Sequence, residues 1–178
     1  MAKIYLKTVR LSFPSLFKKS VFQGVESKKY EATFLINKDT QADQIKAVEK
    51  EIKDFILQTF GEGKAPKALK ITCFQDGDTK DYDGYENHMA LKASTSRRPL
   101  VIDKDKSPIV EEDNIVYAGC YVNSIISLWF SDHPTGGKQI LANLEGIQFV
   151  KDGASFGDAG VSADAFDAFG SDDEEDFI

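Results

Sequence analysis

The chain has 178 residues, the size of one ordinary domain, and its apolar content of 42% is enough for a hydrophobic core. Two cysteines, Cys73 and Cys120, are too few for a disulfide framework or a four-cysteine zinc site. The net charge of −7 is unevenly distributed, because residues 151–178 carry nine acidic residues and one basic residue, which leaves the first 150 residues at +1. The negative net charge of the whole chain therefore does not exclude nucleic acid as a ligand of the first 150 residues.

The sequence contains neither a recognisable signal peptide nor a membrane-spanning segment. The first seven residues already contain two lysines and lack the apolar stretch of a signal peptide. The longest apolar run, residues 125–130, is far shorter than a membrane span. We therefore expect a cytoplasmic protein with reduced core cysteines and no membrane partner.

Two stretches near the N-terminus alternate between apolar and polar residues, as half-buried strands do. Residues 3–13 form the first, with Ile4, Leu6 and either Val9 or Leu11 on its apolar side, and Pro14 is expected to end it. Residues 28–36 form the second, after a loop over 15–26. The apolar side of this second strand consists of Tyr30, Ala32, Phe34 and Ile36.

The apolar spacing then changes to three and four residues, which predicts one amphipathic helix over residues 41–60. Thr40 with Asp43 three residues later predicts a capping box at its start. Gly61 is expected to end it. The apolar positions are Ile45, Val48, Ile52, Phe55, Ile56 and Phe60.

Strand-like patterns return after the helix. Further strands are expected over residues 68–74, 88–95, 100–102, 117–130 and 139–150, with a polar loop over 75–87 and a turn over 135–138. In the strand over 117–130, alternation places Val122, Ile126, Leu128 and Phe130 on the inner face. Tyr121 and Trp129 then face outward, and Gly119 is a candidate bulge or point of close approach. Many short strands with one helix predict a mainly β fold, a small closed or partly open barrel resembling an OB-fold.

The last segment differs in composition from the rest. From residue 152 it consists mostly of Gly, Ala, Ser and Asp, so we expect a domain over 1–151 and a disordered acidic tail over 152–178. A run of carboxylates closed by two apolar residues is more than solubility requires, and it favours a partner-binding end over a purely solubilising tail. That end comprises Asp172, Asp173, Glu174, Glu175, Asp176, Phe177 and Ile178.

The usual patterns of catalysis and metal binding are missing from the sequence. Residues 135–138 (TGGK) lack the leading glycine of a phosphate-binding loop, and the two histidines lie on separate elements. The acidic residues of the loop over 75–87 do not have calcium-loop spacing, because Lys80 interrupts them and no Glu closes the pattern. We therefore expect neither catalytic residues, nor a cofactor, nor a metal. The acidic residues concerned are Asp76, Asp78, Asp81, Asp83 and Glu86.

The residues needed to bind a single nucleic-acid strand are present. Such binding requires cations along the phosphates and flat rings on which any base can stack. A single aromatic residue is more often an ordinary core or surface residue, whereas Lys92, Arg97 and Arg98 are stronger candidates because their charged ends must be solvated or paired. The full candidate set is Lys7, Arg10, Lys18, Lys19, Lys28, Lys29, Tyr30, Tyr82, Tyr85, Lys92, Arg97, Arg98, Tyr121 and Trp129.

Four stretches, in this order, resemble a family of phage-encoded single-stranded DNA-binding proteins with an OB-fold and an acidic tail. They are Asp76-Gly77-Asp78, residues 98–103 (RPLVID), residues 117–123 (YAGCYVN) and residues 144–153 (LEGIQFVKDG). One departure is the helix, which follows the second strand here, whereas the usual OB arrangement places it between the third and fourth. This departure implies either a variant topology or a miscounted strand.

The resemblance also implies a function. The barrel would coat exposed DNA strands during replication or recombination in the host cytoplasm, largely without sequence preference. The tail would compete for the groove and recruit a polymerase, helicase, primase or recombinase. A homodimer is left open.

The main alternative is a protein-binding or assembly module that binds no DNA and docks a basic partner through its tail. An RNA or duplex binder is disfavoured by the weak basic excess and by the lack of a helix suited to the major groove. An enzyme is the least favoured reading.

Overall fold

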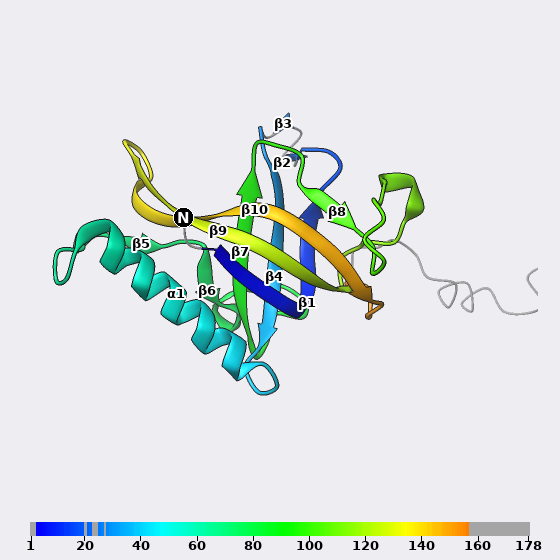
Figure 1. The fold of residues 1–178 in the computed structure, drawn as a ribbon, viewed down its shortest axis with the longest axis horizontal. Helices are drawn as coiled ribbons and strands as arrows, with labels where there is room; N and C mark the ends of the chain where they lie inside the picture. Colours follow the sequence, from blue (N-terminus) through cyan, green and yellow to red (C-terminus); the bar gives the residue numbers. More distant parts are fainter. Residues whose placement is uncertain (1–2, 20, 23–24, 27, 157–178) are drawn as a thin grey trace, which may run out of the picture.

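The computed structural model describes residues 3–19, 21–22, 25–26 and 28–156, which form a β-barrel with one long helix (Figure 1). Its strands are β1 (Lys3–Ser15), β2 (Val21–Phe22), β3 (Val25–Glu26), β4 (Tyr30–Asn37), β5 (Lys70–Ile71), β6 (Phe74–Asp76), β7 (His88–Thr95), β8 (Leu100–Ile102), β9 (Tyr121–His133) and β10 (Gly137–Lys151). Its helices are α1 (Ala42–Phe60) and two single 3-10 turns, η1 (Gly77–Thr79) and η2 (Glu111–Asp113).

Five long strands close the barrel in the order β1, β4, β7, β10, β9 and back to β1. All these pairings are antiparallel except the one between β7 and β10, which is parallel and joins Ser94 to Asn143. The third and fifth barrel strands along the chain are thus parallel neighbours, as in an OB-fold. Helix α1 follows the second barrel strand, so the expected variant of the topology is confirmed.

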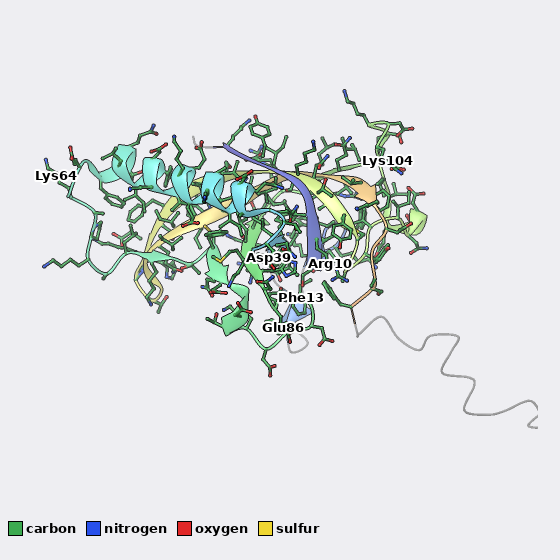
Figure 2. All side chains as sticks on the ribbon, turned by 90° about the horizontal axis from the view of Figure 1, so that it is seen from below. Arg10, Phe13, Asp39, Lys64, Glu86 and Lys104 are labelled. Atoms are coloured by element: carbon green, nitrogen blue, oxygen red, sulfur yellow. The ribbon has the colours of Figure 1, made fainter. Side chains whose placement is uncertain are left out.

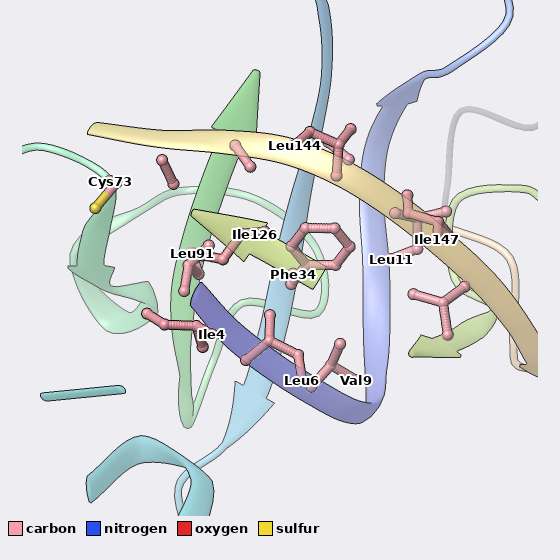
Figure 3. Close-up of a cluster of buried hydrophobic side chains, with 14 of the residues drawn as sticks. Ile4, Leu6, Val9, Leu11, Phe34, Cys73, Leu91, Ile126, Leu144 and Ile147 are labelled. Atoms are coloured by element: carbon pink, nitrogen blue, oxygen red, sulfur yellow. The ribbon is translucent and has the colours of Figure 1, made fainter. Parts of the chain in front are cut away.

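The core lies inside this ring, and strand alternation accounts for it (Figure 3). On β1 the buried residues change phase, from Ile4 and Leu6 to Val9 and Leu11. Thr8 lies at the change with a φ of +53°, and the pairing of β1 with β9 shifts between Leu6 and Val9. The bend therefore turns both halves of one strand toward the same core, which resolves the choice between Val9 and Leu11: both are buried.

Helix α1 lies along one end of the barrel and buries Val48 and Ile52 against the core. The capping-box prediction was wrong, because the helix begins after Gln41 and no side chain caps it. Instead, Asn37 Oδ1 accepts hydrogen bonds from the backbone N–H groups of Asp39 and Thr40 in the preceding turn. Gly61 ends the helix as expected, and its N–H donates to the Leu57 carbonyl.

The alternation predicted for the long C-terminal strand holds, since Val122, Ile126 and Leu128 are buried and Phe130 packs against the core. The strand itself begins later than expected, at Tyr121. Gly119 precedes it with a φ of +111°, and a Cβ there would lie 2.1 Å from the Ala154 carbonyl oxygen. Gly119 is therefore a point of close approach, as its sequence context suggested.

Residues 152–156 pack against the barrel wall after β10; we call them the root segment. The Tyr117 hydroxyl donates to Asp152 Oδ1 (2.9 Å), and the Phe156 N–H donates to the Ala118 carbonyl (3.2 Å). The rest of the predicted tail lies outside the described residues, so the boundary at residue 151 stays a prediction. Among the described residues, no helix is long and apolar enough to cross a membrane.

Candidate nucleic-acid interface

A hollow of about 690 Å³ lies on the outer face of β4 and β7; we call it the first hollow. Strand alternation explains which residues form its floor. Phe34 and Leu91 pair across the two strands and point into the core. Their sequence neighbours Thr33 and Lys92, which also pair with each other, therefore point outward. In OB-folds the face formed by these two strands and the loop between the first two strands bind oligonucleotides. The first hollow therefore lies where a nucleic-acid ligand of this fold is expected.

Two exposed aromatic rings stand at the edge of the first hollow. The rings of Phe13 and Tyr82 have centroids 5.0 Å apart in an edge-to-face arrangement, and the two residues are 50% and 54% exposed. We call this pair the aromatic ridge. Tyr85 supports it from below, because it is buried and its hydroxyl lies 2.9 Å from Ser12 Oγ. Of the predicted stacking residues, Tyr82 is thus open to a base and Tyr85 is not.

Phe13 was missed by the sequence reasoning, because strand alternation after Leu11 would turn it inward. The structure instead has an irregularity between Ser12 and Ser15, and Phe13 has a φ of +45°, which non-glycine residues rarely adopt. Bulges of this kind redirect a side chain, and such strain is concentrated at functional sites. Figure 2 shows Phe13 beside the loop that carries Glu86. The one sequence signal was Pro14, which marks the break in the strand.

The loop that carries Tyr82 is fastened at both ends. Lys38 Nζ lies 2.6 Å from Asp76 Oδ1 and 2.6 Å from Asp78 Oδ2, and Asp78 Oδ1 accepts from the Asn87 N–H at 2.9 Å. We call Lys38, Asp76 and Asp78 the Lys38 clamp. The hydrogen bond from Lys38 lowers the pKa of Asp76, while the Asn87 N–H and then Lys38 lower the pKa of Asp78. The clamp holds η1 at the start of the loop against the turn after β4.

The clamp also explains part of the acidic cluster that raised the question of calcium. Asp76 and Asp78 are engaged by an ammonium group, and no group of three or more His, Cys, Asp or Glu among the described residues could hold a metal ion. Cys73 borders the first hollow but is buried, and burial raises the pKa of its thiol to about 12. It therefore stays protonated at neutral pH.

Two lysines supply positive charge at the first hollow. Lys92 rises from its floor with a side chain that is 62% exposed, and its Nζ lies 3.7 Å from Glu31 Oε2. A pair this long and exposed contributes little, so Lys92 remains able to meet a phosphate. Lys80, which the sequence reasoning did not select, also lines the first hollow and is exposed.

Most of the other predicted cations gather at one end of this face. Tyr30 pairs with Thr95, so the start of β4 and the end of β7 lie together, and the lysines before β4 adjoin the arginines after β7. The Arg98 guanidinium lies 5.6 Å from the Phe17 ring centroid, and Lys29 Nζ lies 5.6 Å from that of Trp129. We call this region the basic end. It comprises Phe17, Lys18, Lys19, Lys28, Lys29, Tyr30, Arg97, Arg98 and Trp129.

Three predicted residues lie away from this face. The N–H of Lys7 donates to Gln44 at the start of α1. The Tyr121 ring packs near Lys151, whose Nζ lies 5.0 Å from its centroid. Arg10 is engaged by the root segment, as described below. Residues 172–178, predicted to bind partners, lie outside the described residues.

The root segment borders a second hollow, of about 530 Å³, which also includes Phe13 and Tyr82. The Arg10 guanidinium lies 4.2 Å from the Phe156 ring centroid, and it donates hydrogen bonds to the carbonyls of Gly119 and Ala154. The Phe156 ring packs directly against Gly84. A Cβ at position 84 would lie 2.2 Å from that ring, so a larger residue there would displace Phe156. The aromatic ridge thus stands between the two hollows.

Comparisons with known proteins show the family of this chain and agree with its fold. The family model described as "Enterobacter phage Enc34, ssDNA-binding protein" matches residues 2–178. A protein of Acyrthosiphon pisum secondary endosymbiont phage 1, described as "Putative protein p50", is 38% identical over 184 residues, which cover 99% of this chain and 98% of that protein.

Solved structures of phage single-stranded DNA-binding proteins have a similar fold. The single-stranded DNA-binding protein of bacteriophage Enc34 in complex with single-stranded DNA aligns with a TM-score of 0.73 at 28% identity, over 88% of this chain and 90% of that chain. The same protein described without DNA gives 0.72 at 30% identity, over 93% and 90%. Gp2.5 of bacteriophage T7 shares the fold, with a TM-score of 0.51 at 16% identity over 93% of each chain.

Fold and comparisons together define a class, that of phage single-stranded DNA-binding proteins with an OB-like barrel. The chain belongs to the Enc34 single-stranded DNA-binding protein family, which is one of binding proteins and not of enzymes.

Proposed function

We propose that this protein binds single-stranded DNA across the outer face of β4 and β7, and that it coats exposed strands during phage replication or recombination in the host cytoplasm. The observation that carries the proposal is the aromatic ridge, two half-exposed rings at the edge of a hollow that also presents Lys80 and Lys92. Exposed rings beside cations are what a single strand requires and a duplex cannot use, because duplex bases are already stacked on one another.

The strand runs from the basic end across the first hollow to the aromatic ridge. At the basic end, Arg98 on Phe17 and Lys29 on Trp129 place a cation beside a ring, so each pair can meet a phosphate and a neighbouring base. Further along, Lys92 and Lys80 meet phosphates while Phe13 and Tyr82 stack on bases. Stacking contributes about 1–3 kcal/mol per base and tolerates any base, so binding is largely independent of sequence.

The acidic tail competes with DNA for this track. Arg10 and Tyr117 fix the root segment beside the aromatic ridge, so the last described residue, Phe156, lies at the edge of the groove with 22 residues still to follow it. The composition of the tail predicts a flexible chain, and a flexible chain of that length spans about 26 Å on average, enough to reach the lysines of the first hollow. Tethering makes the tail an effective competitor, and DNA that displaces it leaves its end available to replication or recombination proteins.

Binding to equal-length single-stranded and duplex DNA at two salt concentrations, followed by fluorescence anisotropy, tests the proposal. We expect much tighter binding to the single strand, with a log–log salt slope of about −0.7 per phosphate neutralised. Equal affinity for the duplex would contradict the proposal. The pair Arg97→Ala and Arg98→Ala should lower both affinity and slope, since it removes two cations from the basic end.

A further inference from the structure

The second hollow differs from the first in its charge. Both include Phe13, Pro14 and Tyr82, so they meet at the aromatic ridge and a strand that crosses the ridge enters the second hollow. Two lysines, Lys80 and Lys92, and one acidic residue, Glu31, line the first hollow. Two acidic residues, Asp81 and Asp83, line the second. Among the described residues that line the second hollow, none is a lysine or arginine.

This composition selects which part of a nucleotide can enter. Two exposed carboxylates repel a phosphate, so the backbone must stay outside the second hollow. Four aromatic residues line the same space, namely Phe13, Tyr82, Tyr117 and Phe156, and rings favour a flat base. Ionised carboxylates only accept hydrogen bonds, so the favoured base is one that donates them.

We infer that the second hollow is a nucleobase subsite that prefers bases with an exocyclic amino group over thymine. The inference rests on the proposed function and adds a local sequence preference to it. Cytosine offers an amino donor at N4 and adenine at N6, whereas thymine offers an acceptor, O4, at the corresponding position. Asp81 and Asp83 accept from the amino group and oppose O4.

The root segment belongs to this subsite. Phe156 supplies one of its rings and is held there by Arg10 at 4.2 Å, while the Tyr117 hydroxyl, which donates to Asp152 Oδ1 at 2.9 Å, fixes the chain on the other side. Ser155 and Phe156, at the end of the root segment, thus form part of the wall of the DNA site, and residues 152–154 connect that wall to β10. This gives the first five residues after β10 a role distinct from that of the acidic end.

Oligonucleotides of thymidine and of 5-methyldeoxycytidine provide a matched pair of probes. The two bases share the 5-methyl group. They differ at position 4, where thymine carries O4 and the cytosine ring carries the amino group, and at N3, which donates in thymine and accepts in the cytosine ring. At neutral pH and equal length, we expect the full-length protein to bind the 5-methyldeoxycytidine oligonucleotide about fivefold or more tightly. In the double variant Asp81→Asn and Asp83→Asn the preference should vanish, because an amide donates as well as accepts.

A control must separate hydrogen bonding from charge. Glu62→Gln together with Glu86→Gln removes the same two charges from exposed positions that do not line the second hollow, and it should keep the preference. Phe156→Ala should weaken binding of both oligonucleotides and leave a residual preference. Matching unfolding curves establish that each variant is folded.

The outcomes distinguish the subsite from the proposed function. Equal binding of the two oligonucleotides by the unmodified protein, or an unchanged preference in the Asp81 and Asp83 variant, overturns the subsite and leaves DNA binding intact. Failure to bind either oligonucleotide overturns both.

Discussion

The guanidinium of Arg10 lies 4.2 Å from the ring centroid of Phe156 and ties the first strand to the segment that follows the last one. It also donates hydrogen bonds to the carbonyls of Gly119 and Ala154. The origin of the acidic tail is therefore a fixed point on the barrel beside the aromatic ridge. Arg10, which looked like a DNA contact in the sequence, is engaged in holding that point.

Replacing Arg10 with Met should release the root segment without removing a phosphate contact. We expect a loss of about 1–2 kcal/mol in the free energy of unfolding, because hydrogen bonds from a charged group are lost while part of the site is open to water. Limited proteolysis should cut earlier after β10. The salt slope of DNA binding should stay unchanged; a shallower slope would mean that Arg10 meets a phosphate.

The aromatic ridge should account for a large share of the binding energy. Phe13→Ala and Tyr82→Ala should each weaken binding to single-stranded DNA by about 1–3 kcal/mol and leave the salt slope nearly intact, as loss of stacking does. Tyr5→Ala is the matched control, because Tyr5 is 70% exposed on the outer side of β1 and lines neither hollow. An equal loss of DNA affinity from Tyr5→Ala would contradict this prediction, because it would indicate that DNA binds the other face of the barrel.

The Lys38 clamp should act on DNA binding through the loop that carries Tyr82. Lys38 lines neither hollow, so Lys38→Met should lower DNA affinity while keeping the salt slope, and Lys38→Arg should restore much of it. A slope that fell together with affinity would make Lys38 a phosphate contact instead.

The same clamp gives a pH dependence with a defined sign. The folded-state pKa values of Asp76 and Asp78 are lowered, so the stability that the clamp contributes is present above their unfolded values and is lost as pH falls through the folded ones. The difference in Tm between the unmodified protein and Lys38→Met should therefore be full at neutral pH and shrink on acidification below the ordinary range of an aspartate. A constant difference would assign the effect to packing of the lysine stem.

Deleting residues 171–178 removes five carboxylates and the apolar end. The part of the tail that competes with DNA is then gone, while the DNA-binding groove is unchanged. Affinity for single-stranded DNA should rise, most clearly at low salt, because screening over about 8 Å at physiological salt weakens the tail's attraction. Replacing Phe177 and Ile178 by Ala should keep the competition and lose contact with replication partners. A truncated protein with unchanged affinity that still supports its partners would reduce the tail to a solubility device.

Much of the fold followed from local patterns. The three- and four-residue spacing from Ile45 to Phe60 defined α1, and the strand predicted over residues 88–95 coincides with β7, because both signals lie within one element. The position of the helix after the second barrel strand was also visible in the order of these patterns. The site was less accessible, since Phe13 is redirected by a bulge and the Lys38 clamp joins residues 38 and 40 positions apart. Periodicity carries no information about such contacts.

Photo-crosslinking tests the central claim, that DNA lies across the outer face of β4 and β7. A single strand carrying 4-thiothymidine would be bound by the full-length protein, irradiated, and the modified residues identified by mass spectrometry. We expect adducts on Phe13 and Tyr82, with further adducts at the basic end on Phe17 or Trp129. Adducts confined to Tyr5 and Tyr121, away from both hollows, would contradict it.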